Sequence, residues 1–100
     1  MRQETIYIKG EQNVEVQHPD VTLGDIVQFE CSNPEVLPKL RTLKIMKFQE
    51  EKGHRCVISI LKIMECIHKQ YPVYDLQNVG EADIIVTYEK QKRKMWYFIG

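Results

Sequence analysis

The stretch of residues 56–80, CVISILKIMECIHKQYPVYDLQNVG, constrains the fold of this chain more than any other part of the sequence. It opens with apolar, β-branched residues, which are typical of a short buried strand. Ser59 then stands where an N-cap residue accepts a hydrogen bond from a free backbone N–H. Apolar residues follow at helical spacing until Pro72, which ends the helix, and residues 73–79 are typical of extended chain. The stretch therefore predicts a strand, an amphipathic helix and a second strand.

The predicted helix has an apolar stripe on one face and charged residues on the opposite face. No other element of the sequence shows a stripe as clear, so we expect the rest of the chain to pack against this helix. The stripe consists of Ile60, Ile63, Met64, Ile67 and Tyr71.

Further strands are predicted on both sides of this stretch. Residues 5–9 and 14–17 have strand character and are separated by a turn, so we expect them to form a hairpin. A second hairpin is expected between residues 44–49 and 55–58, with a polar turn between them. Residues 83–89 form the strongest strand pattern in the chain, with two different faces in strict alternation.

Two short helices are predicted in the N-terminal half. Thr22 and Asp25 have the spacing of a capping-box variant and predict a helix that runs through Phe29. Asn33 followed by Pro34 is an N-cap with proline at the first helical position, and predicts a helix to about residue 42.

The order of these elements favours an α+β fold, because strands and helices are segregated rather than strictly alternating. We expect one domain over residues 1–89, with a mixed or antiparallel sheet of five to six strands. Two short helices and one longer helix would pack mainly on one face of that sheet.

The charges of the chain are distributed unevenly. Residues 1–89 carry 10 basic and 14 acidic side chains, whereas residues 90–100 carry basic side chains only. An apolar, aromatic run, residues 95–99, follows the basic cluster, as at the cytoplasmic edge of a transmembrane helix. We favour this membrane-proximal interpretation over a solvated tail or a nucleic-acid contact. The basic residues are Lys90, Lys92, Arg93 and Lys94.

The apolar run is too short to cross a bilayer, which takes about 20 residues. We therefore expect residues 90–100 to be a juxtamembrane segment and the start of a membrane span that the sequence interrupts. The first ten residues lack the apolar region of a signal peptide, so the start of the chain is expected to stay in the cytoplasm.

No arrangement of residues in the sequence supports catalysis, a cofactor or a metal. His68 lies one helical turn after Glu65, but a metal site in a helical bundle needs a second such pair. Cys66 and His68 point in nearly opposite directions on a helix and cannot form a thiol–imidazole pair. We expect the cysteines, Cys31, Cys56 and Cys66, to be small, buried and reduced.

The segment VISILKIMECIHKQYPVYDLQNVGEADIIV resembles the corresponding region of the stage V sporulation protein AA family of endospore-forming Firmicutes. In that family a strand runs into a helix that ends in an Ile-His pair, here Ile67-His68, and a short strand leads to a Val-Gly turn, here Val79-Gly80. An Ile/Val-rich strand and a basic run follow. The N-terminal segments TIYIKG, NVEVQHPD and VTLGDIVQ also fit, so that the resemblance covers essentially residues 4–94.

The resemblance implies a soluble N-terminal domain followed by two membrane spans. It also implies membership of the machinery in the inner forespore membrane that moves dipicolinic acid, with calcium, into the developing spore and releases it at germination. The partners would be the other subunits of this complex, and a homo-oligomer is compatible with the sequence. The resemblance assigns no catalytic, cofactor-binding or metal-binding residue.

The expected function is therefore that of a non-enzymatic, cytoplasm-facing domain that works through protein–protein contacts. Such a domain should show an exposed sheet edge or an apolar patch. The candidate edge is the strand of residues 83–89, with Ile84, Val86 and Tyr88, and the candidate patch contains Leu23, Ile26 and Phe29.

Two other functions are weaker alternatives. Direct binding of the dipicolinate dianion would need convergent basic side chains, and only Arg41, Lys44 and Lys47 cluster in sequence. A small α+β nucleic-acid-binding module would need exposed aromatic residues interleaved with basic ones, which occur only within residues 88–97. The net negative charge of residues 1–89 argues against nucleic acid as a partner.

Overall fold

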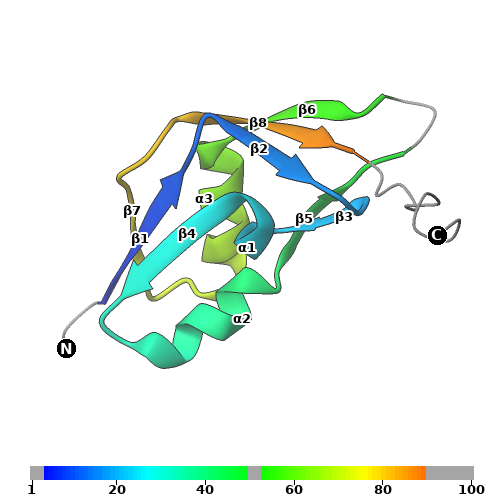
Figure 1. The fold of residues 1–100 in the computed structure, drawn as a ribbon. Coiled ribbons are helices and arrows are strands. Elements are labelled where there is room, and N and C mark those ends of the chain that lie inside the picture. Colours follow the sequence, from blue (N-terminus) through cyan, green and yellow to red (C-terminus); the bar gives the residue numbers. More distant parts are fainter. Residues whose placement is uncertain (1–3, 50–52, 90–100) are drawn as a thin grey trace, which may run out of the picture.

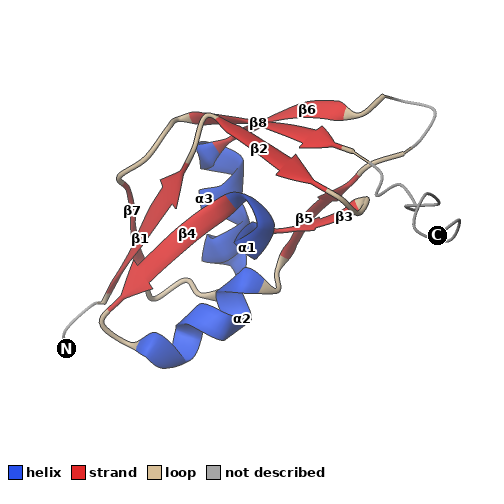
Figure 2. Ribbon diagram, in the orientation of Figure 1, coloured by secondary structure: helices blue, strands red, loops and turns tan. Residues whose placement is uncertain are grey.

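The computed structural model describes residues 4–49 and 53–89. Within these residues the chain forms an α+β domain of short strands and helices (Figures 1 and 2). The strands are β1 (Thr5–Gly10), β2 (Asn13–Val16), β3 (Asp20–Thr22), β4 (Val27–Cys31), β5 (Lys44–Lys47), β6 (Arg55–Ser59), β7 (Asp75–Asn78) and β8 (Asp83–Tyr88). The helices are α1 (Leu23–Ile26), α2 (Leu37–Arg41), which follows a 3-10 turn η1 (Pro34–Val36), and α3 (Ile60–Gln70).

The predicted α+β class and the three helices are confirmed, but the strands form several small sheets instead of one. Their orders are β4-β1-β7, β2-β8-β6 and β3-β5 among the described residues. Both predicted hairpins are wrong. β1 does not pair with β2, because β1 lies between β4 and β7 and β2 pairs with β8. Likewise β5 pairs with β3, whereas β6 pairs with β8. Alternation along a strand fixes its buried face but leaves the choice of its partner to the tertiary fold.

Two long segments of chain, β1–β2 and β7–β8, run side by side and in parallel through both three-stranded sheets. Their backbone ladder continues between the sheets, where the N–H of Val79 donates to Ile8 O at 2.9 Å and the N–H of Glu81 donates to Gly10 O at 3.1 Å. A Cβ on Gly80 would lie 2.5 Å from the nitrogen of Gly10. The two backbones therefore touch at a point where only glycine fits at position 80.

The core contains the apolar stripe of α3, as predicted. Ile63 and Ile67 are fully buried and Ile60 nearly so, whereas Met64 and Tyr71 pack half-buried at its margin. The strands contribute fully buried side chains from the other side of the core. These are Ile6 and Ile8 of β1, Val21 of β3, and Ile84 and Val86 of β8.

The capping predictions for the helices are confirmed. The Ser59 hydroxyl accepts from the N–H of Leu61 at 3.2 Å, and α3 ends one residue before Tyr71, which precedes Pro72. At α1, the Asp25 carboxylate reaches back to the Thr22 N–H at 2.9 Å and completes a capping box.

The predicted length of the first helix is wrong. α1 ends at Ile26, and Val27 to Cys31 form the strand β4, which pairs antiparallel with β1. Apolar and polar side chains alternate in residues 27–30. This pattern is typical of a strand with one face toward the core and the other toward solvent. The second predicted helix is divided into η1 and α2, with Pro38 in the first turn of α2, where proline is tolerated.

Candidate interaction surface

The residues predicted to form an apolar patch lie in the core. Leu23 and Ile26 on α1 and Phe29 on β4 are all buried. A small domain has few apolar side chains with which to form a core, so the apolar residues of a short segment are more often buried than exposed. The prediction of an exposed patch at these residues is therefore wrong.

The predicted sheet edge is also wrong, because β8 is the central strand of the β2-β8-β6 sheet. Its inward side chains Ile84, Val86 and Tyr88 are buried, although the predicted alternation of faces along the strand is confirmed. A strand with the strongest β pattern in the chain is suited to the centre of a sheet. The predicted membrane-proximal residues, Lys90, Lys92, Arg93 and Lys94, lie outside the described residues.

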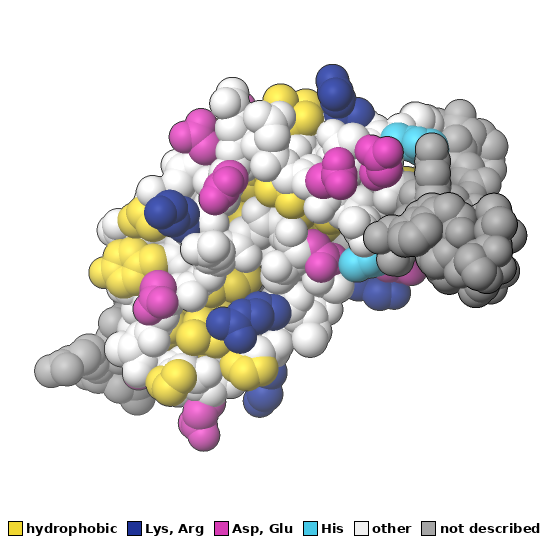
Figure 3. Space-filling model, in the orientation of Figure 1, with side chains coloured by type: hydrophobic (Ala, Val, Ile, Leu, Met, Phe, Trp, Pro, Cys, Tyr) yellow, Lys and Arg dark blue, Asp and Glu magenta, His cyan; other side chains and the backbone are white. Residues whose placement is uncertain are grey.

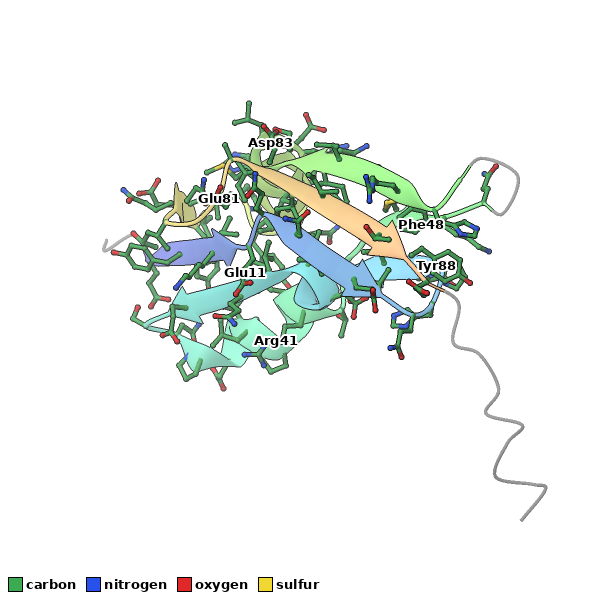
Figure 4. The ribbon with its side chains drawn as sticks, turned by 45° about the horizontal axis from the view of Figure 1, so that its top comes forward. Glu11, Arg41, Phe48, Glu81, Asp83 and Tyr88 are labelled. Atoms are coloured by element: carbon green, nitrogen blue, oxygen red, sulfur yellow. The ribbon has the colours of Figure 1, made fainter. Side chains whose placement is uncertain are left out.

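Tyr88 belongs to a small aromatic cluster at the end of the domain where β8 ends. Its ring stacks on Phe48 with 5.5 Å between the centroids, and the His54 ring packs edge-on against it at 5.3 Å. Figure 4 shows Phe48 and Tyr88 next to each other at this end. Because this ring is buried, it is not available to stack on a nucleic-acid base.

The strand β6 presents a free edge instead. It is an outer strand, and no described strand pairs with its second side. The N–H of Tyr88 donates to His54 O at 2.7 Å, and the N–H of Ile60 donates to Ala82 O at 2.8 Å. Hydrogen-bonded and non-bonded pairs alternate along an antiparallel ladder, so Cys56 and Ile58, between His54 and Ile60, also direct their main-chain groups toward β8. The outward main-chain N–H and C=O groups are therefore those of Arg55, Val57 and Ser59.

The side chains of these same residues lie on the outer face of the sheet. Val57 is 61% exposed and lies opposite the half-buried Ile85 of β8, so the two form a short apolar stripe. Leu61, at the start of α3, is 72% exposed. Figure 3 shows hydrophobic and basic side chains next to each other over β6. The apolar run from Cys56 to Ile58 predicts a strand buried on both faces, which is wrong for Val57. Arg55 and Ser59, two positions before and after Val57, are the signal in the sequence for a solvent-facing row.

Two open hollows lie on the surface of the described residues. One, of about 240 Å³, lies beside β5 and β6, and its lining includes Phe48, Arg55 and Cys56. The other, of about 190 Å³, has Val14, Ile26 and Val27 among its lining residues, together with the charged side chains Lys9, Glu11 and Asp25. None of the charged or polar residues that line these two hollows is buried, so neither hollow has a desolvated polar group that would select a ligand.

The carboxylate of Asp25 is the best-connected ionised group in the described residues. Partial burial tends to raise the pKa of Asp25, but hydrogen bonds from the N–H and hydroxyl of Thr22, and from His18, together hold it below its usual value of 3.8. The His18 ring nitrogen Nε2 lies 3.2 Å from Asp25 Oδ2, and the His18 side chain is largely exposed. This carboxylate serves to cap α1.

The other titratable residues discussed above remain apart from one another. His68 and Glu65 are exposed on α3, and residues 4–49 and 53–89 contain no group of His, Cys, Asp and Glu that could hold a metal ion. The cysteines Cys31, Cys56 and Cys66 are free but half-buried, and thus less buried than predicted. Among the described residues, no helix is both long and apolar enough to cross a membrane.

The fold has a counterpart among solved structures. A crystal structure of a functionally unknown protein from Eubacterium ventriosum ATCC 27560 matches with a TM-score of 0.83 and 30% sequence identity. The match covers 89% of this chain and 97% of that one. No curated protein matches the chain.

The sequence model of stage V sporulation protein AA matches residues 3–92. The match extends over both halves of the domain, from before β1 to beyond β8, and thus includes all the elements described above. The chain therefore belongs to the stage V sporulation protein AA family.

Proposed function

We propose that this chain is the cytoplasm-facing domain of a membrane protein in the machinery that transports dipicolinic acid, with calcium, across the inner membrane of the forespore. It would act in uptake during sporulation and in release at germination, without catalysis of its own, by contacting other subunits of the transport complex. Membership of the family implies the role in sporulation. The transport role, the location and the subunit contacts are the parts that we propose.

The observation that carries this proposal is that the basic and apolar run follows β8 directly in the sequence. β8 ends at Tyr88, and Lys90 begins the basic cluster two residues later. β1 begins at the other end of the domain from the point where β8 ends (Figure 1). A basic cluster directly followed by aromatic and apolar residues is the pattern expected at the cytoplasmic face of a membrane. The end of β8 would then face the bilayer, while the opposite end would point into the cytoplasm.

A contact function is supported by how the domain uses its polar groups. The Asp25 carboxylate, whose pKa is lowered, caps a helix and lies beside an exposed imidazole rather than in a closed pocket. The free edge of β6, by contrast, offers main-chain donors and acceptors that pair with no other described strand, next to exposed apolar side chains. Edges of this kind accept a further strand from a partner.

The proposal can be tested by fractionating sporulating cells that make the full-length protein with an affinity tag. We expect the protein in the forespore membrane fraction, and we expect other subunits of the dipicolinic acid transport machinery to co-purify from detergent-solubilised membranes. A matched variant that replaces the four basic residues, Lys90, Lys92, Arg93 and Lys94, with serine should keep the fold of residues 4–89 but reduce correct membrane insertion. A soluble protein free of those subunits would overturn the proposal.

The nucleic-acid alternative has no structural observation in its favour. The described residues carry 8 basic and 12 acidic side chains, so this part of the domain is net negative. An electrophoretic mobility-shift experiment with single-stranded DNA at low salt serves as the control, and we expect no shift.

A further inference from the structure

We propose that the free edge of β6 pairs with β6 of a second copy of this chain, antiparallel and centred on Val57. The two β2-β8-β6 sheets would then form one continuous sheet across the two copies. This inference deepens the proposed function: it rests on the same free edge of β6 that supports a contact role, and it assigns that edge to a second copy, so contacts with other subunits would use other surfaces.

The main chain of β6 is suited to pairing with itself. Arg55, Val57 and Ser59 direct their N–H and C=O groups away from β8. With a two-fold axis beside Val57, this residue faces its own counterpart and each Val57 donates to the other's carbonyl oxygen. Arg55 of each copy then faces Ser59 of the other in the same hydrogen-bonded geometry.

The side chains favour this register over one centred on Arg55. The two Val57 side chains meet on the outer face, and Ile85 of each copy extends the apolar stripe to either side. Arg55 of one copy faces the neutral Ser59 of the other copy. Asp83, which pairs with that Ser59 on β8, places a negative charge one strand away from the Arg55 side chain. A register centred on Arg55 would instead set two guanidinium groups directly opposite each other, which is destabilising.

These self-complementary features identify a second copy as the occupant of the edge. A heterologous strand would need a matching pattern of its own, whereas in this register β6 already places its one charged residue, Arg55, opposite the neutral Ser59 of the second copy. The contact is small compared with a standard interface of about 800 Å² per partner. We therefore expect a weak dimer that forms at high concentration or where membrane attachment raises the local concentration.

The test is sedimentation of the whole 100-residue chain over a wide concentration range, at low and moderate salt, for wild type and two lysine variants. Val57→Lys places two ammonium groups face to face at the axis. Val79→Lys is the matched control, because Val79 is 57% exposed and follows β7 in the other three-stranded sheet. Both sites are exposed, so circular dichroism should show both variants folded.

We expect wild type and Val79→Lys to dimerise alike and Val57→Lys to dimerise at least tenfold more weakly. A second experiment uses Val57→Cys in a Cys56→Ser background under mild oxidation, with Val79→Cys in that background as control. Hydrogen-bonded partners in an antiparallel pair have Cα atoms about 5.5 Å apart, which a disulfide can span, so position 57 should cross-link selectively. A wild-type chain that stays monomeric at every concentration, or a dimer that Val57→Lys leaves intact, would overturn the inference.

Discussion

Gly80 lies where two backbone segments touch, and we expect its replacement by alanine to destabilise the domain strongly. The added Cβ would lie 2.5 Å from Gly10 N, 2.7 Å from Gly10 O and 3.0 Å from Lys9 Cα, whereas ordinary contacts begin at 3.4 Å. All three atoms are backbone and cannot move aside by changing a rotamer. The two segments would have to separate by several tenths of an ångström, at the centre of the ladder that joins both three-stranded sheets.

The magnitude follows from what such a separation disrupts. The neighbouring hydrogen bonds, from Val79 to Ile8 and from Glu81 to Gly10, would lengthen, and each is worth about 1 kcal/mol. Overpacking adds about 1–3 kcal/mol, and the reduced freedom of the unfolded chain returns at most about 1 kcal/mol. We therefore expect Gly80→Ala to lower the free energy of unfolding by about 2–4 kcal/mol, a large part of the stability of a domain of this size.

The assay is urea unfolding followed by far-ultraviolet circular dichroism, with Gly53→Ala as the matched control. Gly53 has a φ of +96° and no atom within 4 Å of an added Cβ, so its replacement introduces backbone strain of about 1–2 kcal/mol but no steric contact. Gly80→Ala should be the more destabilised of the two variants. A Gly80→Ala domain within about 0.5 kcal/mol of wild type would refute the reasoning that the two backbones touch there.

Two further predictions concern the capping box and the core. Asp25→Ala should lower the free energy of unfolding by about 1 kcal/mol at neutral pH, because the carboxylate that accepts a hydrogen bond from the Thr22 N–H is lost. The pKa of Asp25 is lower in the folded than in the unfolded state, so this contribution is present above about pH 4 and is lost as the pH falls through the folded pKa. Urea unfolding at several pH values should show the gap between wild type and variant narrowing in acid, and a gap that widens would contradict the assignment. In α3, Ile63→Ala should cost about 2–5 kcal/mol because Ile63 is fully buried, whereas Leu61→Ala, at a position 72% exposed, should change stability by less than about 0.5 kcal/mol. Equal losses in thermal unfolding of these two variants would show that the buried face of α3 is assigned incorrectly.

The elements that local chemistry determines could be predicted from the sequence. The stripe of α3, its Ser59 cap, the capping box of α1 and the alternation of β8 all depend on residues within a few positions of one another. The partners of the strands depend on contacts between distant segments. The turn at Gly10 suggested a hairpin, whereas the chain there passes from one sheet into the next beside Gly80.

The interaction surface was predicted less well for a related reason. An apolar residue in a sequence pattern does not show whether it faces the core of its own domain or a partner. Leu23 and Ile84, selected as surface candidates, are fully buried, while Val57, read as buried, is exposed on an outer strand. The central position of β8 and the outer position of β6 in the same sheet distinguish Ile84 from Val57.

The most direct test of the proposed role is the dipicolinic acid content of spores that carry either Gly80→Ala or Gly53→Ala in the full-length protein. If the folded domain is needed for transport, spores with Gly80→Ala should contain much less dipicolinic acid than wild-type spores, and spores with Gly53→Ala should be close to wild type. A normal dipicolinic acid content in spores whose Gly80→Ala domain is shown to be unfolded would contradict the account.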